Sequence, residues 1–364
     1  MFLRWRMFVA CSLLIAGVAL LRPCPAAAGE VSWSSPYRAL APIRHDNLTV
    51  FPVIAAVSHN TEAFLTLDEG IRSGEVVITE SGNAQPLVRP RHGVARPVPY
   101  SGPQVNRLVL VNNSQRPLIL LAGEIVTGGK QDRVIGKDRL VPPESDPIDL
   151  GVFCVEPGRW TATKNNFGSL DSAMAQPAVR SKAMADKNQE MVWSEVRSAQ
   201  AAVAAQLPAP MASAVADMKS YAGVMQNDEV KQKVDSMAIP VQRDYESVIK
   251  QLRDRNAVGV VVAVNGEIIW ADVFASPQLL AKYWPKLVRS YAAEAFVNPA
   301  KGPDVEVHSA QKFLDDMDSR REVVETEPGL FRHTEITGDG FKAFELTSLL
   351  PKTGFDLHLA KMAD

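Results

Sequence analysis

An Asn-Gly pair set between two β-rich runs limits the folds open to this chain more than any other short signal. Val258–Val264 precedes Asn265-Gly266, and Ile268–Phe274 follows it. This pattern is typical of a β-hairpin closed by a two-residue turn. The chain is therefore predicted to contain an antiparallel sheet.

A helix and a second hairpin are expected further along. Ser276-Pro277 predicts the start of a helix that reaches about Phe296, because Ser caps helices and Pro is favoured at their first position. Phe331–Ile336 and Phe341–Leu346, which are joined across two glycines, predict the second hairpin. Phe355–Leu359 predicts a closing strand.

The N-terminal half has the pattern of a β-rich region. Thr66 and Glu69 have the spacing of a capping box, which predicts a short helix that Gly74 ends. Residues 112–114 predict a hairpin turn, and residues 81–104, with five Pro, predict a loop. The expected strands are Leu48–Ala56 with Pro52 at an edge or bulge, Val76–Thr79, Arg107–Val111, Leu118–Val126 and Ile148–Val155.

The middle of the chain is predicted to be helical. Residues 170–255 are rich in Ala, Gln, Met and Lys, and their apolar residues recur at helical spacing. The expected helices are Ser194–Gln206, Ala212–Met225, Asp228–Met237 and Arg243–Arg255, the last preceded by Pro240. This order favours an α+β fold, a single domain over 29–364 that is β-rich over 47–160, helical over 170–255 and mixed over 256–360.

Residues 1–28 have the layout of a secretory signal peptide. Arg4 and Arg6 make a basic start, Met7–Leu21 is apolar, and Ala26-Ala27-Ala28 supplies small residues before a predicted cleavage after Ala28. The apolar run is shorter than the ~20 residues that span a bilayer as a helix. We expect a periplasmic or secreted protein, with an uncleaved anchor as the alternative.

Charge and cysteine content exclude some classes of protein. The predicted signal takes three Arg with it, so 36 basic and 41 acidic residues remain, a net charge of −5. A nucleic-acid binder would show a basic stripe, so nucleic acid is not an expected partner. Cys154 would be the one thiol left, which precludes an internal disulfide. No later segment is apolar enough for stable membrane insertion.

The stretch from Leu118 to Trp160 carries the densest run of polar residues between apolar strands. One apolar run leads into a Gly-Gly turn, and a second run, Ile148–Val155, ends before Pro157-Gly158. The two strand ends are predicted to bring their turns together. The candidate site residues are Glu124, Gly128, Gly129, Lys130, Gln131, Asp132, Arg133, Glu156, Arg159 and Trp160.

The Gly-Gly turn suggests a way to bind a small polar or anionic molecule. Two glycines let backbone N–H groups converge, while Lys130 and Arg133 could neutralise an anion. Gln131 could recognise a polar edge and Asp132 a hydroxyl. The turn lacks the spacing of a P-loop. The alternative is an internal ion-pair network of Lys130 or Arg133 with the two glutamates.

Glu124 and Glu156 are the candidate catalytic residues. If both lie at one mouth of a sheet, one could have a raised pKa and act as a general acid or base. Each could instead neutralise Arg133 or Arg159. The pair Arg159-Trp160 could clamp a planar anion, or Trp160 could fill the core.

Other chemistries are not indicated. The six His are scattered without paired spacing, so no metal site is expected, and no cofactor is implied. Neither GxSxG nor SxxK occurs, which disfavours a serine hydrolase. Cys154 lies between Phe153 and Val155 and is predicted to be a buried structural residue.

The motifs GEIVTGGKQDRV and CVEPGRW resemble a bacterial family, the ARG-and-rhodanese-phosphatase-superfamily-associated domain. The resemblance starts at the strand that holds Asn47–Pro52, passes through Thr66–Glu69 and extends to Trp160 and into the later hairpin and helix. The family's association with ADP-ribosylglycohydrolase-like and phosphatase-like proteins implies nucleotide or phosphorylated ligands.

Three functions are therefore open. The first is an exported domain that recognises a small polar or anionic ligand at the two turns. The second is a hydrolase or transferase that uses a Glu as general acid or base on a phosphorylated or nucleotide-like substrate. The third is a structural envelope-associated interaction protein in which the polar cluster is a buried salt-bridge lock.

Overall fold

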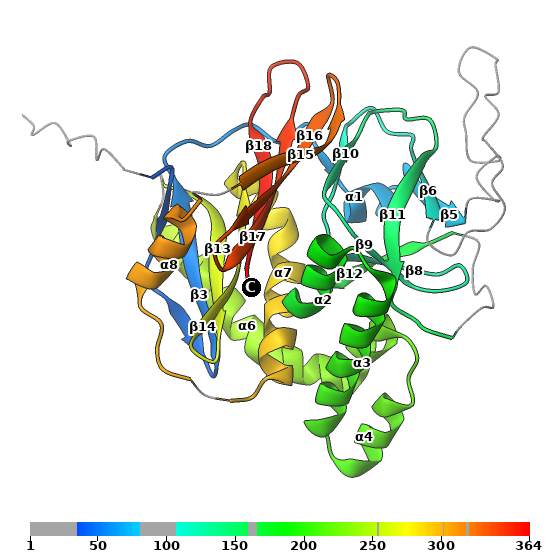
Figure 1. Cartoon of the computed structure of the whole chain (residues 1–364), viewed down its shortest axis with the longest axis vertical. Helices are drawn as coiled ribbons and strands as arrows, with labels where there is room; N and C mark the ends of the chain where they lie inside the picture. Colours follow the sequence, from blue (N-terminus) through cyan, green and yellow to red (C-terminus); the bar gives the residue numbers. More distant parts are fainter. Residues whose placement is uncertain (1–34, 81–106, 159–165, 253–254, 301, 318–319) are drawn as a thin grey trace, which may run out of the picture. The chain divides into compact units, whose positions relative to one another are not determined.

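Two groups of strands form the framework on which the helices pack (Figure 1). The computed structural model describes residues 35–80, 107–158, 166–252, 255–300, 302–317 and 320–364. Ser35–Asp364 clusters as one compact unit. The α+β class predicted from the order of elements is confirmed, with strands in the N-terminal half, helices in the middle and strands at the C-terminal end.

The larger group is an antiparallel sheet of nine strands. Its order is β1-β3-β13-β14-β18-β17-β16-β15, with β2 also paired to β3. The strands are β1 (Tyr37–Ala39), β2 (Ile43–His45), β3 (Leu48–Ala55), β13 (Asn256–Val264), β14 (Glu267–Phe274), β15 (Arg320–Glu327), β16 (Phe331–Gly338), β17 (Phe341–Ser348) and β18 (Asp356–Ala363). Because β3 pairs with β13, residues 37–55 and the C-terminal third of the chain share one sheet.

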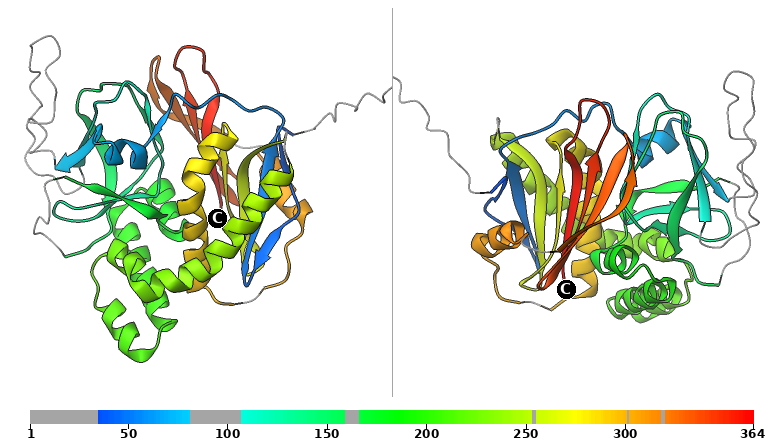
Figure 2. Two further views of the ribbon diagram at one scale, coloured as in Figure 1. Left: turned by 180° about the vertical axis from the view of Figure 1, so that it is seen from behind. Right: turned by 45° about the horizontal axis from the view of Figure 1, so that its top comes forward.

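Helices cover both faces of this sheet (Figure 2). Successive residues of a strand point to opposite faces, and Val50 and Phe51 of β3 accordingly join different apolar clusters. The first cluster packs on α6 (Asp228–Gln251) and α7 (Pro277–Val297), and the second on α8 (Val307–Asp315).

The locally encoded elements of this sheet are as predicted. Asn265 (φ 56°) and Gly266 (φ 83°) make the turn between β13 and β14. The β16–β17 hairpin and the closing strand β18 are also present. The helix α7 begins at Pro277, and Ser276 Oγ accepts the Leu279 N–H at 3.0 Å.

The smaller group contains a six-stranded sheet, β12-β8-β9-β11-β6-β5, and a three-stranded sheet, β10-β7-β4. Its strands are β4 (Leu65–Thr66), β5 (Val76–Glu80), β6 (Arg107–Asn112), β7 (Leu118–Leu120), β8 (Glu124–Thr127), β9 (Arg133–Ile135), β10 (Arg139–Val141), β11 (Ile148–Cys154) and β12 (Gly168–Met174). One apolar cluster packs residues of both sheets together.

The predicted capping box starts α1 (Leu67–Arg72), with Thr66 and Glu69 bonded to each other's backbone N–H.

Two predictions for this group are wrong. The expected strand Leu118–Val126 is broken into β7 and β8, which belong to different sheets, because Gly123 adopts a φ of +94°. Residues 112–114 do not close a hairpin, since β6 pairs with β5 and β11 whereas β7 pairs with β10 and β4. The Asn112 side chain instead binds the backbone carbonyls of Arg116 and Pro142, which holds a wider loop.

The helical middle differs from prediction in several places. Residues 170–174, expected to be helical, belong to the strand β12, and the helix expected from Ser194 begins at Gln189. The remaining helices are α2 (Pro177–Ser181), the π-helix η3 (Lys182–Asp186), α3 (Gln189–Ala205), α4 (Ala209–Ala216) and α5 (Tyr221–Gln226). The expected helix Ala212–Met225 is divided because Ser220 caps the start of α5. Pro240 does not separate two helices, since α6 continues through it and buries apolar residues on both sides of it, including Val234 and Tyr245.

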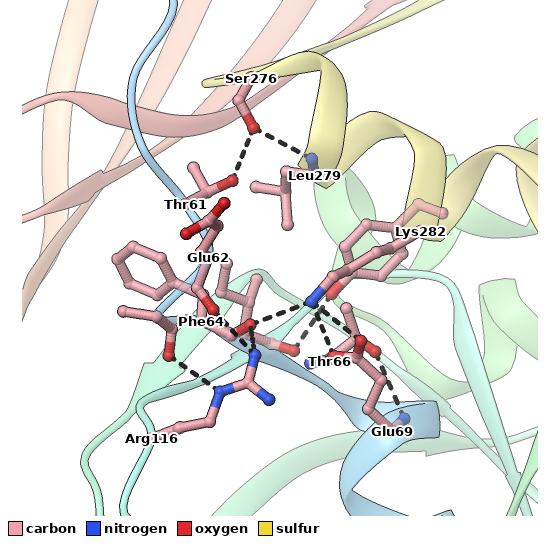
Figure 3. A network of polar contacts seen from close by, with 12 residues as sticks. Thr61, Glu62, Phe64, Thr66, Glu69, Arg116, Ser276, Leu279 and Lys282 are labelled. Carbon is pink, nitrogen blue, oxygen red and sulfur yellow. Dashed lines mark hydrogen bonds and ion pairs between the residues drawn. The ribbon is translucent and has the colours of Figure 1, made fainter.

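The segment between β3 and β4 connects the two groups of strands, and a polar network fixes it (Figure 3). Thr61 Oγ1 lies 2.6 Å from Ser276 Oγ at the start of α7. Arg116 Nη2 donates to the carbonyls of Glu62 and Phe64 at 3.0 and 2.7 Å. Lys282 Nζ of α7 reaches the capping-box Glu69 at 2.9 Å. The loop is thus bonded to both groups.

Candidate functional site

The Gly128-Gly129 turn links β8 to β9 and can be built only with glycine. Both residues have positive φ, 135° and 48°. A Cβ on Gly128 would lie 2.9 Å from the Asn166 carbonyl oxygen, and one on Gly129 would lie 2.3 Å from the Phe167 ring. The turn is therefore pressed against the residues that lead into β12.

Backbone N–H groups do converge in this turn, and carboxylates of the protein itself accept them. Gly128 N donates to Asp132 Oδ1 at 3.1 Å, and Lys130 N donates to Glu80 Oε1 at 3.0 Å. Asp132 N donates to Glu156 Oε2 at 3.0 Å. Glu80, Asp132 and Glu156 are all buried. These N–H groups therefore already have anionic acceptors.

The two strand ends that were predicted to be neighbours lie side by side. Arg133 of β9 is paired with Cys154 of β11, and Val155 N donates to the Asp132 carbonyl at 3.1 Å. Glu156 consequently lies next to Asp132. Ser220, which caps α5, donates its Oγ–H to Asp132 Oδ2 at 2.7 Å. Arg159 and Trp160 lie outside the described residues.

Gln131 differs from its neighbours in the turn. Its side chain is only 1% exposed, and among the described residues neither its Oε1 nor its Nε2 has a hydrogen-bond partner. Buried amide groups are nearly always bonded to protein or water. The next residues on either side, Lys130 and Asp132, both have their backbone N–H groups bonded. Gln131 therefore presents an unused donor and an unused acceptor.

Glu124 belongs to a different cluster. It is the first residue of β8, so the length of this strand, ~10 Å at ~3.3 Å per residue, separates it from the turn. Lys286 Nζ of α7 lies 2.5 Å from Glu124 Oε1 and 2.6 Å from Asp68 Oδ2, and Leu121 N donates to Glu124 Oε2 at 2.8 Å. Glu124 and Glu156 are thus not arranged as a carboxylate pair.

In this second cluster, the charge of each group shifts the pKa of its neighbours. Burial raises the pKa of Glu124, while the Lys286 ammonium opposes that rise. Burial would lower the pKa of Lys286, but the carboxylates of Glu124 and Asp68 outweigh it and raise the pKa. Lys286 therefore stays protonated between them. Glu124 therefore belongs to an internal ion-pair network whose cation is Lys286 of α7.

Cys154 is fully buried at the end of β11. Burial raises the pKa of its thiol, which disfavours the thiolate that a nucleophile requires. The Gln189 side chain bonds both the N–H and the carbonyl of Cys154 at 2.9 Å and so anchors α3 to β11. Within the described part of the chain, no three His, Cys, Asp or Glu side chains are grouped as metal ligands would be.

A buried charge network went unrecognised in the sequence. Arg180 of α2 makes a bidentate pair with Asp272 of β14, at 2.9 and 3.0 Å. His358 of β18 lies between Asp272 and Asp138, with its ring nitrogens 3.0 and 2.5 Å from their carboxylates. Burial would lower the pKa of His358, but the Asp138 and Asp272 carboxylates outweigh it and raise the pKa to about 9. No spacing in the sequence signals this network.

The fold is α+β, and the turn from Gly128 to Asp132 holds two glycines of positive φ next to buried polar side chains. The family model that matches the chain is the ARG and Rhodanese-Phosphatase-superfamily-associated Protein domain, over residues 36–360, and the chain belongs to this family. Comparisons with curated proteins and with solved structures gave no match. None of the helices in the described residues combines the length and apolar character needed to span a bilayer.

Proposed function

We propose that this protein recognises a small polar ligand at the turn Gly128–Asp132. The Gln131 amide forms hydrogen bonds with a neighbouring donor and acceptor on that ligand. The observation that supports this is the buried Gln131 side chain with both polar atoms unpartnered among the described residues. Leaving a buried polar group unsatisfied costs ~1–3 kcal/mol. A ligand with a matching edge would recover this free energy on binding.

A neutral polar ligand fits the turn better than an anion. The carboxylates of Glu80, Asp132 and Glu156 surround the turn and bind its N–H groups. An anion would have to displace these carboxylates from the N–H groups that it needs. A primary amide, a nucleobase edge or a peptide fragment offers the neighbouring donor and acceptor that an amide side chain binds.

Recognition without chemistry is the role that the geometry favours over catalysis. A Glu that serves as general acid or base must lie within hydrogen-bond reach of a reacting group, whereas Glu124 is bonded to Lys286 and Glu156 accepts the Asp132 N–H. The lock proposed as the third function describes the Lys286 cluster well. It does not account for the unpaired amide of Gln131.

The test is a thermal-shift screen of the chain from residue 29 onward, with nucleosides, nucleotides, sugar phosphates, primary amides and peptidoglycan fragments. The decisive variant is Gln131→Met, which keeps the shape of the side chain and removes its polar atoms. We expect a ligand that stabilises the wild-type protein and does not stabilise Gln131→Met. The ligand-free variant should also have an unfolding free energy equal to or above that of the wild type, because an unsatisfied group is removed.

The matched control is Gln176→Met. Gln176 is buried to the same extent, and its side chain bonds Glu294 and Tyr221. This variant should be destabilised by ~1–3 kcal/mol and should keep ligand binding. The proposal fails if Gln131→Met binds the ligand normally, or if Gln131→Met loses as much stability as Gln176→Met and no compound in the screen binds the wild-type protein.

We also propose that the chain is exported. The support is the basic start, apolar run and small-residue end of residues 1–28. N-terminal sequencing of the protein recovered from a bacterial periplasmic fraction should begin at Gly29. Recovery of the protein in the cytoplasm with Met1 intact would contradict export and would leave the ligand proposal untouched.

A further inference from the structure

A separate cavity of about 190 Å³ lies where the edge of the large sheet meets the smaller group of strands and η3. One wall comes from Lys137, which follows β9, and from Lys187, which follows η3. The facing wall comes from β15, β16 and β17, and Met184 and Phe344 supply apolar surface. The whole lining belongs to the described residues. Gln131, by contrast, precedes β9, so the cavity and the turn lie at opposite ends of that strand.

His333 of β16 lines this cavity with an unused nitrogen. The residue is 1% exposed, and its Nδ1 has no hydrogen-bond partner within the described structure. Its ring stacks on Phe344, with centroids 6.1 Å apart. Burial lowers the pKa of His333, so that the imidazole is neutral at pH 7 and one of its nitrogens is an acceptor.

Two ion pairs flank the cavity. Lys137 pairs with Glu325 of β15, and Lys187 pairs with Glu335 of β16. Glu325 is the cross-strand partner of His333, and Glu335 is two residues along β16, so both carboxylates share the face of the imidazole. The lysines approach from the other wall. The lining therefore offers two cations, two anions and a neutral acceptor, with no excess of either charge.

We propose that this cavity binds a small zwitterion of the α-amino-acid class. The ligand's ammonium group bonds the His333 imidazole and a carboxylate of Glu325 or Glu335, and its carboxylate bonds Lys137 or Lys187. Its apolar side chain packs on Met184 and Phe344. A cavity of about 190 Å³ suits a small aliphatic amino acid.

The experiment is isothermal titration calorimetry of the chain from residue 29 onward with L-alanine, L-valine, L-leucine and L-methionine. At least one should bind with a millimolar or lower Kd. The deaminated and decarboxylated analogues of the best binder, for L-valine 3-methylbutanoate and isobutylamine, should each bind at least tenfold more weakly. Equal binding of either analogue, or no binding of any amino acid at 10 mM, would overturn the proposal.

Two variants locate the binding in this cavity. His333→Phe keeps an aromatic ring and removes the acceptor, and we expect at least a tenfold rise in Kd, whereas the exposed His308→Phe should leave Kd unchanged. Lys187→Gln acts at a half-exposed side chain, so it keeps the test valid should His333→Phe fail to fold. It should weaken binding by at least fivefold, and the exposed Lys250→Gln should not. Unchanged binding in Lys187→Gln and His333→Phe refutes the assignment.

Discussion

At the scale of single residues, the buried Arg180 shows how this core tolerates charge. A lone cation in an apolar interior is very costly, and it persists only with a well-placed partner. The Asp272 carboxylate accepts two parallel hydrogen bonds from the guanidinium, and the Tyr291 hydroxyl donates to the same carboxylate. The centre of the Trp270 ring lies 4.4 Å from the guanidinium carbon. With His358 and Asp138 the cluster holds two cations and two anions. Its charges cancel.

Removing one of these charged side chains should therefore leave an opposite charge buried without its partner. We predict that Arg180→Met lowers the unfolding free energy by ~3–5 kcal/mol, because Asp272 keeps its charge without its bidentate partner. Urea titration followed by circular dichroism measures this. The exposed pair Arg243 and Asp244, at 3.1 Å, is the control, and Arg243→Met should change the free energy by less than ~0.5 kcal/mol. Similar small losses of unfolding free energy in both variants would show that the buried pair stabilises the fold no more than the exposed pair does.

The same cluster predicts a loss of stability at alkaline pH. The pKa of His358 rises to about 9 in the folded chain, from an ordinary value of 6.5. Between these values the folded state binds more protons than the unfolded state, so the unfolding free energy falls as pH rises. The contribution of His358 is complete below about pH 6.5 and is lost on passing pH 9, and it is on the order of 3 kcal/mol.

A variant isolates this titration from others. Lys361, whose pKa burial lowers to about 8, acts in the opposite sense above that pH. We therefore compare urea midpoints of the wild type and His358→Gln at pH 6 and pH 9.5. The difference between the two proteins should shrink by most of its value at the higher pH. The exposed His308→Gln should show no such change relative to the wild type. A constant difference for His358→Gln would mean that the histidine is neutral when buried.

At the scale of elements, Gly123 decides where two strands separate. It lies between β7 and β8 with φ of +94°, and a Cβ there would meet Cγ, Cδ and Nε of Arg180 at 2.6–2.8 Å. Arg180 cannot withdraw without breaking its pair with Asp272. The break between the strands and the buried charge cluster are thus one structural feature.

Gly123→Ala should accordingly lower the unfolding free energy by more than backbone strain alone would. A left-handed conformation costs an alanine ~1–2 kcal/mol, and we predict at least ~2 kcal/mol beyond this from displacement of Arg180. The control is Gly340→Ala in the β16–β17 turn, where φ is +75° and no atom lies within 4 Å of the added Cβ. Thermal unfolding of both variants separates the two costs. Equal losses would contradict the contact with Arg180.

The sequence predicts those elements whose causes are local. The Asn265-Gly266 turn, the Thr66–Glu69 capping box and the Ser276-Pro277 start of α7 depend on residues within one or two turns of the chain, and all three are present. The break at Gly123 and the passage of α6 through Pro240 depend on packing against distant residues. Those two boundaries could not be read from neighbouring residues.

The same distinction applies to the candidate site. The turn residues follow directly from two apolar runs, so their placement at adjacent strand ends could be inferred. Glu124 could not be placed, because its partners Asp68 and Lys286 come from α1 and α7. His358 and Asp138 are 220 residues apart in the chain. Pairs at that separation leave no local pattern, and a lone His in a strand is commonly an ordinary core residue.

At the scale of the whole molecule, buried polar bonds join the two groups of strands. His358 of the large sheet bonds Asp138 beside β10, and Lys286 of α7 bonds Glu124 of β8. Tyr283 of α7 donates to the carbonyl of Ile119 in β7 at 3.3 Å. Each contact would be exposed and lost if either group unfolded alone. The free energy of these contacts therefore couples the unfolding of one group to that of the other.

This coupling predicts one cooperative unfolding transition for the chain from residue 29 onward, although proteins of this length often unfold in steps. Differential scanning calorimetry should give a single peak, with a ratio of calorimetric to van't Hoff enthalpy near one. Lys286→Met should move that peak to lower temperature, because Glu124 and Asp68 lose the cation between them. Two peaks in the wild-type protein would show that the groups unfold independently, and that these buried bonds are too weak to join them.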